Sequence, residues 1–447
     1  MKDYLRIIIL VLTVWAAAAT VAAVHLWLTR NADNLSPSIG PIAAPILEPA
    51  PEGGVLSVTL PETNGADTGT IDDVLDPEPA PIPTPVAPVV VHPQSAQGLR
   101  RVEFNPPIGD IYYIHYDQRS GYLFMATVET GGVRAIWRLS SDLELRRVLL
   151  GNSRPGEIFL SADSQGVLYA GFSDPGYLFR SADLGDSWTL VADNIDGAFW
   201  SLADDGHGTL WASLHAYNKA WLYRSTDYGN SWRVWKNFQE IFPEYAVNYR
   251  EGDDRLMLRH LHDVAFEDGR LFVGVGDVAR FTVMSADDGE TWQEVWSEGF
   301  TAHVPTIDGD GLLLGPDRLQ THGIALHDFA SGQTTEVWSP IPYGYAGYTY
   351  SMMEMNGVYY AAFHTETNEV QEFAGKSGII VSPDGYHWYP FLELDPLTHW
   401  ARTDIFMSPG RRLNGSFSEY GFITLNGVLY QFEPPIGRWF EVHTRFE

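Results

Sequence analysis

The stretch SADLGDSW, Ser181 to Trp188, recurs along the chain with its key residues at the same spacing. It returns as STDYGNSW from Ser225 to Trp232 and as SADDGETW from Ser285 to Trp292. A looser copy, SPDGYHW, runs from Ser382 to Trp388. Such a recurrence predicts one structural unit used several times, with the quoted stretch at a turn inside each unit.

Residues 99–447 divide into seven such units with a period of about 45 to 50 residues, a range typical of propellers and solenoids. Each unit contains short apolar strands separated by polar or Gly-containing turns. The units begin near Ile111, Ile158, Phe199, His262, His303, Tyr350 and Asp404, and the last one ends in PIGRWFEV, Pro435 to Val442. Four strands in each of seven units predict an all-β, seven-bladed β-propeller, in which radial repetition protects the sheet edges.

The recurring stretch has the residue types that a tight turn between the third and fourth strands needs. Gly adopts positive φ, and the Asp and Ser side chains accept hydrogen bonds from turn amides. The Trp ring is expected to pack against the next blade. The residues to which we assign this structural role are Ser181, Asp183, Gly185, Trp188, Ser225, Asp227, Gly229, Trp232, Ser285, Asp287, Gly289, Trp292, Ser382, Asp384, Gly385 and Trp388.

The Ser-x-Asp-x-Gly-x-x-Trp pattern resembles the Asp box, also called the bacterial neuraminidase repeat. The resemblance covers nearly all of residues 99–447 and is strongest in the second, third and fourth units. It implies a structural role for the boxes. It does not imply one activity, because Asp-box propellers include sialidases, xyloglucanases, sortilin-type receptors and photosystem assembly factors.

Composition excludes several functional classes. The formal net charge of the 447 residues is −29, and such a field repels phosphate backbones, so we expect no nucleic-acid partner. The chain contains no Cys, which rules out disulfides, thiolate catalysis and Cys-based zinc sites. Aromatic residues make up 13% of the chain, enough for a large packed core.

The first thirty residues are predicted to be a membrane anchor or a signal segment. Residues 7–28 are almost entirely apolar and, at about 1.5 Å per residue, form a helix of about 33 Å, long enough to cross a bilayer. A transmembrane anchor ending at Arg30 is the preferred interpretation, and a cleaved signal peptide with secretion is the alternative. Either interpretation places the following residues outside the cytoplasm, in the periplasm or on a cell or virion surface.

Residues 31–98 are predicted to be a disordered, Pro-rich acidic linker. The segment has no Phe, Trp or Tyr, and it is dominated by Pro, Ala, Thr, Asp and Glu. It cannot bury enough apolar surface to offset its chain entropy. Its Pro-rich part, Pro77 to Pro88, is expected to be an extended spacer that holds residues 99–447 away from a membrane.

Ligand-binding residues are expected on the propeller face opposite the boxes, where first strands begin and second strands end around the central funnel. The candidates in these positions are His215, His260, His262, Asp277, His303, Asp317, Arg318, His364, Glu366 and Arg402, with Tyr345 from the aromatic stretch IPYGYAGYTY. Imidazoles beside carboxylates are typical ligands of zinc and other transition metals. Polar side chains also line any wet funnel, so the sequence leaves metal and cofactor undecided.

The sequence favours a binding module over an enzyme. Sialidase-type hydrolysis needs three Arg residues, a Tyr nucleophile with its Glu base, and an acid/base Asp, and the resemblance to sialidases implies a Phe/Tyr-Arg-Ile-Pro motif. That motif is absent, and SRPG at Ser153 to Gly156 is a poor match. We therefore expect a membrane-tethered module that binds a glycan, a surface or a protein complex, with a sialidase-like glycoside hydrolase as the alternative.

Overall fold

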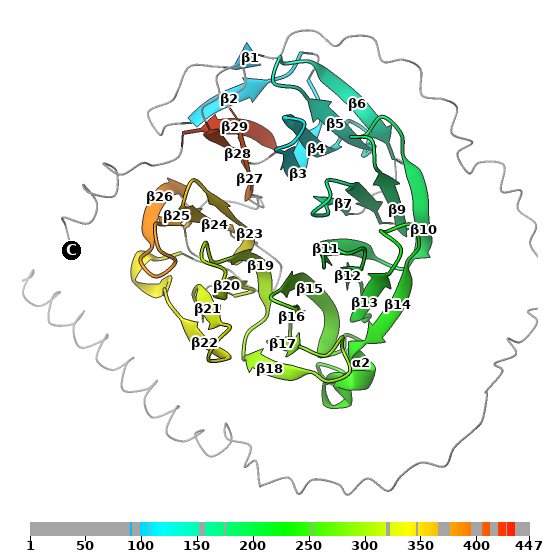
Figure 1. Ribbon diagram of the computed structural model, residues 1–447, viewed down its shortest axis with the longest axis vertical. Coiled ribbons are helices and arrows are strands. Elements are labelled where there is room, and N and C mark those ends of the chain that lie inside the picture. The colour runs from blue at the N-terminus through cyan, green and yellow to red at the C-terminus, as the bar shows by residue number, and fades with distance from the viewer. Residues whose placement is uncertain are drawn as a thin grey trace, which may run out of the picture. The chain divides into compact units, whose positions relative to one another are not determined.

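The computed structural model describes residues 90–91, 99–105, 107–151, 157–173, 176–250, 252, 254–318, 322–345, 347–364, 376–394, 405–411, 419–425 and 427–433. Seven antiparallel sheets stand around a common axis, one sheet to a blade (Figure 1). This confirms the seven-bladed, all-β propeller. Within the described residues no helix is long and apolar enough to cross a membrane. The predicted span 7–28 and residues 31–89 and 92–98 of the predicted linker lie outside the described residues. Val90–Val91, within the predicted linker, instead form a short strand.

The first four blades follow one another along the chain, each with its first strand innermost. Blade 1 contains β3 (Asp110–Asp117), β4 (Tyr122–Val128), β5 (Arg134–Leu139) and β6 (Leu145–Leu150). Blade 2 contains β7 (Ile158–Ala162), β8 (Leu168–Phe172), β9 (Gly176–Ser181) and β10 (Thr189–Ile195). Blade 3 contains β11 (Ala198–Asp204), β12 (Leu210–His215), β13 (Trp221–Ser225) and β14 (Arg233–Asn237). Blade 4 contains β15 (Leu258–Glu267), β16 (Arg270–Asp277), β17 (Phe281–Ser285) and β18 (Gln293–Trp296).

The last three blades complete the ring. Blade 5 contains β19 (Phe300–Pro305), β20 (Gly311–Pro316), β21 (Ala325–Asp328) and β22 (Gln333–Glu336). Blade 6 contains β23 (Tyr348–Met355), β24 (Val358–His364), β25 (Ser377–Ser382) and β26 (Tyr389–Leu394). Blade 7 contains β27 (Ile405–Arg411), β28 (Glu419–Leu425) and β29 (Val428–Phe432), followed outward by β2 (Leu99–Glu103) and β1 (Val90–Val91).

Blade 7 corrects the expected register of the last unit. Its fourth strand is β2, from the N-terminal side of the propeller, which pairs antiparallel with β29 through Leu99↔Phe432 and Arg101↔Tyr430 (Figure 1). Pro435 to Val442, which the sequence analysis placed at the end of this unit, lie outside the described residues. The ring is thus closed by strands from both ends of residues 90–433, which no single repeat unit reveals.

Strand register separates two faces of the propeller. In blade 4, Leu258 pairs with Asp277 at one end of the sheet, whereas Glu267, Arg270 and Ser285 lie at the other end. We call the face with the first-strand starts the entry face, and the face with the Ser-x-Asp-x-Gly turns the turn face. Asp183, Asp227 and Asp287 accordingly lie on the turn face, away from His260, as strand order predicted.

The recurring turns are held by one hydrogen-bond pattern. In blade 3 the Gly229 amide donates to Ser225 Oγ over 2.9 Å, and Ser225 Oγ donates to Asp227 Oδ1 over 2.7 Å. The Ser231 amide and hydroxyl donate to the two oxygens of Asp227. The turns at Asp183 and Asp287 repeat this pattern. Both oxygens of the Asp227 carboxylate therefore accept hydrogen bonds inside their own turn, which fits a structural role.

The Trp residues of these turns pack against the preceding blade, not the next one. Trp232 of blade 3 meets Tyr169 of blade 2 edge to face, with ring centroids 6.1 Å apart. Trp188 joins a cluster with Phe124 of blade 1, and Trp388 joins one with Leu313 of blade 5. Twist of each sheet turns its outer strands relative to its inner strand. The assembled ring therefore decides which neighbouring blade each Trp contacts. The prediction that the Trp ring packs against the next blade was wrong.

Replacing Gly229 with Ala is expected to destabilise the propeller more than the same change at Gly269. Both residues have left-handed backbones, with φ +74° and +73°, where a Cβ costs about 1 kcal/mol. A Cβ at Gly229 would lie 2.2 Å from the hydroxyl of Tyr169, a fully buried side chain, whereas Gly269 has no neighbour within 4 Å. Overpacking adds about 1–3 kcal/mol at Gly229 only. Chemical denaturation measures the free energy of unfolding of both variants. Equal losses of unfolding free energy would contradict the close packing of the turn.

Candidate functional site

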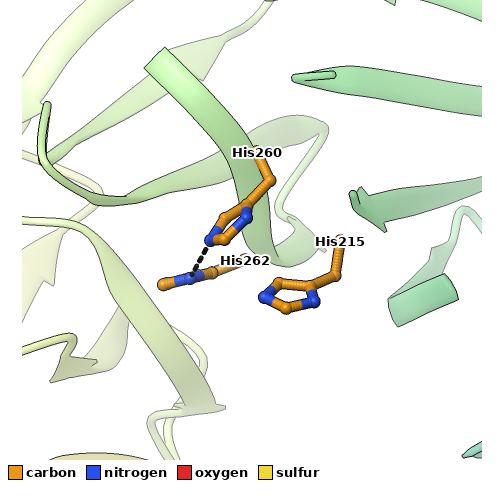
Figure 2. A group of neighbouring side chains, drawn as sticks. All are labelled: His215, His260 and His262. Atoms are coloured by element: carbon orange, nitrogen blue, oxygen red, sulfur yellow. Dashed lines mark hydrogen bonds between the residues drawn. The ribbon is translucent and has the colours of Figure 1, made fainter. Parts of the chain in front are cut away.

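Three histidines from two neighbouring blades meet on the entry face. His215 is the last residue of β12, and His260 and His262 lie near the start of β15 (Figure 2). The Nε2 atoms of His260 and His262 are 3.0 Å apart, and the ring centroids of His215 and His260 are 4.1 Å apart. One ligand atom from each of the three side chains lies within 4.8 Å of the others. We call this group the His cluster.

Local backbone geometry brings these rings together. Side chains two residues apart on a regular strand share a face but stand about 6.7 Å apart at their Cα atoms. The β15–β16 register shifts between Leu258 and Leu261 and again between Leu261 and Val264, so the strand is irregular where His260 and His262 lie. Gly276 makes room for the second ring, because a Cβ there would lie 1.9 Å from His262 Cε1.

Asp277 completes the cluster from the end of β16. Its Oδ2 lies 2.8 Å from Arg259 Nη1 and 3.3 Å from His260 Nε2, and its Oδ1 lies 3.9 Å from His262 Nε2. Its backbone is left-handed, with φ 72°, which Asp tolerates better than most residues. The carboxylate thus faces two imidazoles and is held there by a guanidinium.

Two further carboxylates contact the outer ring nitrogens of the cluster. Glu157, just before β7, lies 3.0 Å through Oε2 from His215 Nδ1. Asp317, just after β20, is completely buried and lies 3.4 Å through Oδ1 from His262 Nδ1. Asp317 Oδ2 accepts a hydrogen bond from the Asp277 amide over 2.9 Å. The inner nitrogens of His215 and His262 are therefore oriented toward the centre of the cluster.

Burial and close charges shift the protonation of this group. Burial, reinforced by His215, lowers the pKa of His260 to about 3, so its imidazole is neutral at pH 7. Burial raises the pKa of Asp277, but His260, His262 and Arg259 outweigh it and hold that pKa well below its ordinary value. Burial raises the pKa of Asp317. A neutral imidazole next to an ionised carboxylate is the protonation state in which both groups can ligate a cation.

His303 belongs to a second polar group, inside the central channel. Its Nδ1 lies 2.6 Å from Asp263 Oδ2, and Ser201 Oγ donates to Asp263 Oδ1. Burial alone would lower the pKa of His303, but Asp263 and Glu267 outweigh it and raise it. These residues line a cavity of about 250 Å³ with residues of all seven blades, among them Trp200, Met352 and Phe406.

The remaining predicted site residues do not join the His cluster in the described structure. Tyr345 is 4% exposed, packs against Trp338 and Phe363, and donates its hydroxyl to Glu393, so it is a core residue and not part of an exposed aromatic surface. Arg318 is half-buried next to Asp317. His364 pairs with Tyr348 at the entry-face end of β24. Glu366 and Arg402 lie outside the described residues.

Sequence reasoning missed the supporting carboxylates Glu157, Asp263 and Glu298. Glu157 precedes a first strand, the same position that selected other candidates, so a complete application of that rule would have found it. Asp263 follows His262 directly, and a regular strand places the side chains of successive residues on opposite faces. Glu298 lies in the link between blades 4 and 5, where no repeat position marks it.

Glu298 makes a pH-dependent contribution to stability. Its carboxylate is 1% exposed and lies 3.0 Å from Arg280 Nε and 3.6 Å from His322 Nε2. Burial, followed by repulsion from Asp317, raises the pKa of Glu298 from 4.5 to about 7. The folded protein therefore holds this proton more tightly than the unfolded chain. The resulting stabilisation is complete below the unfolded pKa and is lost as the pH rises through about 7.

Glu298→Gln is therefore expected to become more stable relative to the parent protein as the pH rises. The gap in unfolding free energy between variant and parent should grow by roughly 2–3 kcal/mol from pH 5 to pH 8. Urea unfolding at both pH values measures it. Glu290→Gln, an exposed carboxylate on the turn face, is the matched control and should show no such growth. A Glu298→Gln gap that is the same at both pH values would contradict the buried proton.

Comparison with known proteins supports the fold and leaves the activity open. No family model matches the chain. A xyloglucanase from Paenibacillus sp is 26% identical over 255 residues, covering 49% of this chain and 24% of that protein. The uncharacterized protein YkuO from Bacillus subtilis (strain 168) is 34% identical over 71 residues, covering 16% of this chain and 23% of that protein. The chain thus spans about a quarter of each of these relatives.

Solved structures show the same architecture at low identity. Virginiamycin B lyase from Staphylococcus aureus superposes with a TM-score of 0.51 at 13% identity, covering 75% of this chain and 99% of the lyase. The extracellular domain of a hybrid two-component system from B. thetaiotaomicron gives a TM-score of 0.51 at 8% identity, covering 76% of this chain and 40% of that one. At such identities the likeness shows the propeller fold alone.

Proposed function

We propose that this chain is a binding module whose propeller recognises a protein partner through its entry face, outside the cytoplasm. In this proposal residues 7–28 anchor the chain and residues 31–98 hold the propeller away from the membrane. The repeated turns are counted as Asp boxes, which serve the fold. The observation that carries the proposal is a rigid, partly apolar projection on the entry face next to the His cluster.

The projection is the connection between β14 and β15. It contains α2 (Phe238–Ile241) and η3 (Pro243–Tyr245). Phe238, Phe242 and Tyr245 turn inward, with Phe238 against Trp292 and the other two against Phe281. Packing from within restrains residues 238–245, so that little ordering entropy of this part is lost when a partner binds.

The projection and the neighbouring β12–β13 connection present tyrosines and arginines in a strongly acidic chain. Tyr249 of the projection is 37% exposed, and Tyr217 of the β12–β13 connection is 53% exposed. The Arg250 guanidinium stacks over Tyr249 at 4.6 Å, and Arg259 lies 5.8 Å from the Tyr217 ring. Tyr and Arg are enriched at the energetic centres of protein interfaces. The central cavity, about 250 Å³, is below the usual size of small-molecule pockets, which favours recognition on this outer surface.

Site-specific photo-crosslinking in the producing cell tests the proposal. A photoreactive amino acid at Tyr217 or Tyr249 should give an adduct with one discrete protein. The controls are Tyr228 and Tyr386, which are 55% and 54% exposed on the turn face. Equal adducts from both faces, or none from Tyr217 and Tyr249, would contradict an entry-face partner.

A glycoside hydrolase is the second candidate, favoured by the 26% identity to the xyloglucanase. Retaining glycosidases place two carboxyl groups about 5–5.5 Å apart, one of them an accessible acid. Asp277 and Asp317 are close enough, but Asp317 is fully buried and Arg259 holds Asp277. Release of reducing sugar from xyloglucan, or of sialic acid from sialosides, by the purified chain would favour hydrolysis over the binding module.

A further inference from the structure

We propose that the His cluster binds one late first-row divalent metal ion, with zinc as the type ligand, through His215, His260, His262 and Asp277. This site is independent of the protein partner proposed above. It lies on the entry face, where β12 of blade 3 meets β15 and β16 of blade 4 (Figure 2).

The spacing of the ligand atoms fits a single cation. Zn–N bonds of 2.0–2.1 Å place tetrahedral ligand atoms about 3.3 Å from one another. The observed separations are 3.0 Å from His260 Nε2 to His262 Nε2 and 3.3 Å from His260 Nε2 to Asp277 Oδ2. His262 Nε2 to Asp277 Oδ1 is 3.9 Å. His260, His262 and Asp277 therefore lie close to tetrahedral ligand separations, and His215 offers one ligand atom within 4.8 Å of those of the two other imidazoles.

Hydrogen bonding can use only one of the two short contacts of His260 Nε2 at a time. His260 Nε2 faces both His262 Nε2 and Asp277 Oδ2, but one imidazole nitrogen carries at most one proton. If His260 donates to Asp277, it has no proton for His262. His260 is 1% exposed and His262 4% exposed, so water gives little compensation. A cation between the rings accepts every one of these lone pairs at once.

The outer contacts are those of metal-bound histidines. A ligating imidazole usually donates its other N–H to a carboxylate, which fixes the tautomer and the ring orientation. Glu157 takes this position at Nδ1 of His215 and leaves Nε2 as the ligating atom. Asp317 Oδ1 lies 3.4 Å from Nδ1 of His262, near this position but without hydrogen-bond geometry among the described residues. Arg259 restrains Asp277 through one oxygen, while the other carboxylate lone pairs stay available.

The donor set selects the kind of metal. Three imidazoles and one carboxylate suit zinc, copper, nickel or cobalt, whereas calcium and magnesium require oxygen ligands. His215 and Asp277, with side chains 22% and 27% exposed, form the accessible side of the cluster and give an ion a route from solvent. A fourth protein ligand makes the site closed, so it stabilises the junction between blades 3 and 4 and needs no catalytic role.

Metal binding is tested on the purified full-length chain, prepared with a tag that contains no histidine. Elemental analysis after dialysis should find one zinc per chain, and a competing chromogenic chelator gives the affinity. Added zinc should raise the melting temperature of the parent protein. Cobalt substituted for zinc should show the intense visible absorption of a tetrahedral site. No retained zinc and no thermal shift would overturn the proposal.

The zinc affinity of variants distinguishes the proposed ligand residues from the carboxylates that orient them. His260→Gln together with His262→Gln should weaken zinc binding at least about 100-fold, more than the loss of an outer partner. If that variant does not fold, His215→Gln, at a partly exposed position, serves the same purpose. Glu157→Gln should keep the one-to-one stoichiometry but weaken affinity about 10–100-fold. His207→Gln and His387→Gln, both exposed on the turn face, are the controls and should bind like the parent. Equal affinity in the double variant and the parent would show that zinc binds elsewhere.

Discussion

Removal of residues 1–104 is expected to abolish cooperative folding of the propeller, whereas removal of residues 1–89 should leave it intact. The shorter deletion keeps β1 and β2, and the longer one removes the strand that closes the ring. Leu99 and Val102 are 6% and 2% exposed, and losing their burial costs about 3–6 kcal/mol. This cost is comparable to the whole stability of many domains.

The loss extends beyond these two side chains. The pairing of β2 with β29 would disappear, and β29 would become a bare sheet edge, which promotes aggregation. The ion pair between Arg100 and Glu433 is partly exposed and contributes little. Circular dichroism, thermal melts and size-exclusion chromatography compare the two truncations. Identical melting of both would mean that β2 does not hold the ring closed.

Trp388→Ala is expected to destabilise the propeller by about 3–5 kcal/mol, the usual cost of removing a buried aromatic side chain. Trp388 is 3% exposed, belongs to a core cluster with Leu313 and Tyr359, and donates its indole N–H to the Gly385 carbonyl over 2.9 Å. Truncation leaves a cavity between blades 5 and 6 and an unpaired carbonyl. Trp188 is only half-buried, so Trp188→Ala should lower the free energy of unfolding by a smaller amount.

The same turn supplies the control. Tyr386 is two residues earlier and 54% exposed, so Tyr386→Ala should change stability by less than about 0.5 kcal/mol. Urea unfolding measures both variants. The fraction of Trp388→Ala that remains folded should retain zinc binding, because the turn and the His cluster lie on opposite faces. A variant with parent stability and lost binding would show that the turns have a direct binding role.

The repeat pattern contained most of the information about the fold. Alternating apolar residues predicted the strands, and the count of seven strand-and-turn repeat units predicted the blade number, because both are local properties of the chain. The position of His260 and Asp277 on the face opposite Asp287 also followed from strand order alone. The same rule placed ten candidates around the funnel, and the structure brings five of them together, namely His215, His260, His262, Asp277 and Asp317.

Only the tertiary structure decided the features that depend on how separate blades meet. Ring closure by β2 and the packing of Trp232 against the preceding blade are contacts between segments far apart in sequence. The inward turn of Tyr345 depends on its packing against Trp338 and Phe363. The His cluster shows the limit most clearly. Its residue types were visible in the sequence, but its 3.0 Å separation arises from an irregular strand and from the space at Gly276. Strand periodicity predicts the face on which a side chain lies, whereas the distance between side chains depends on the packing of the whole ring.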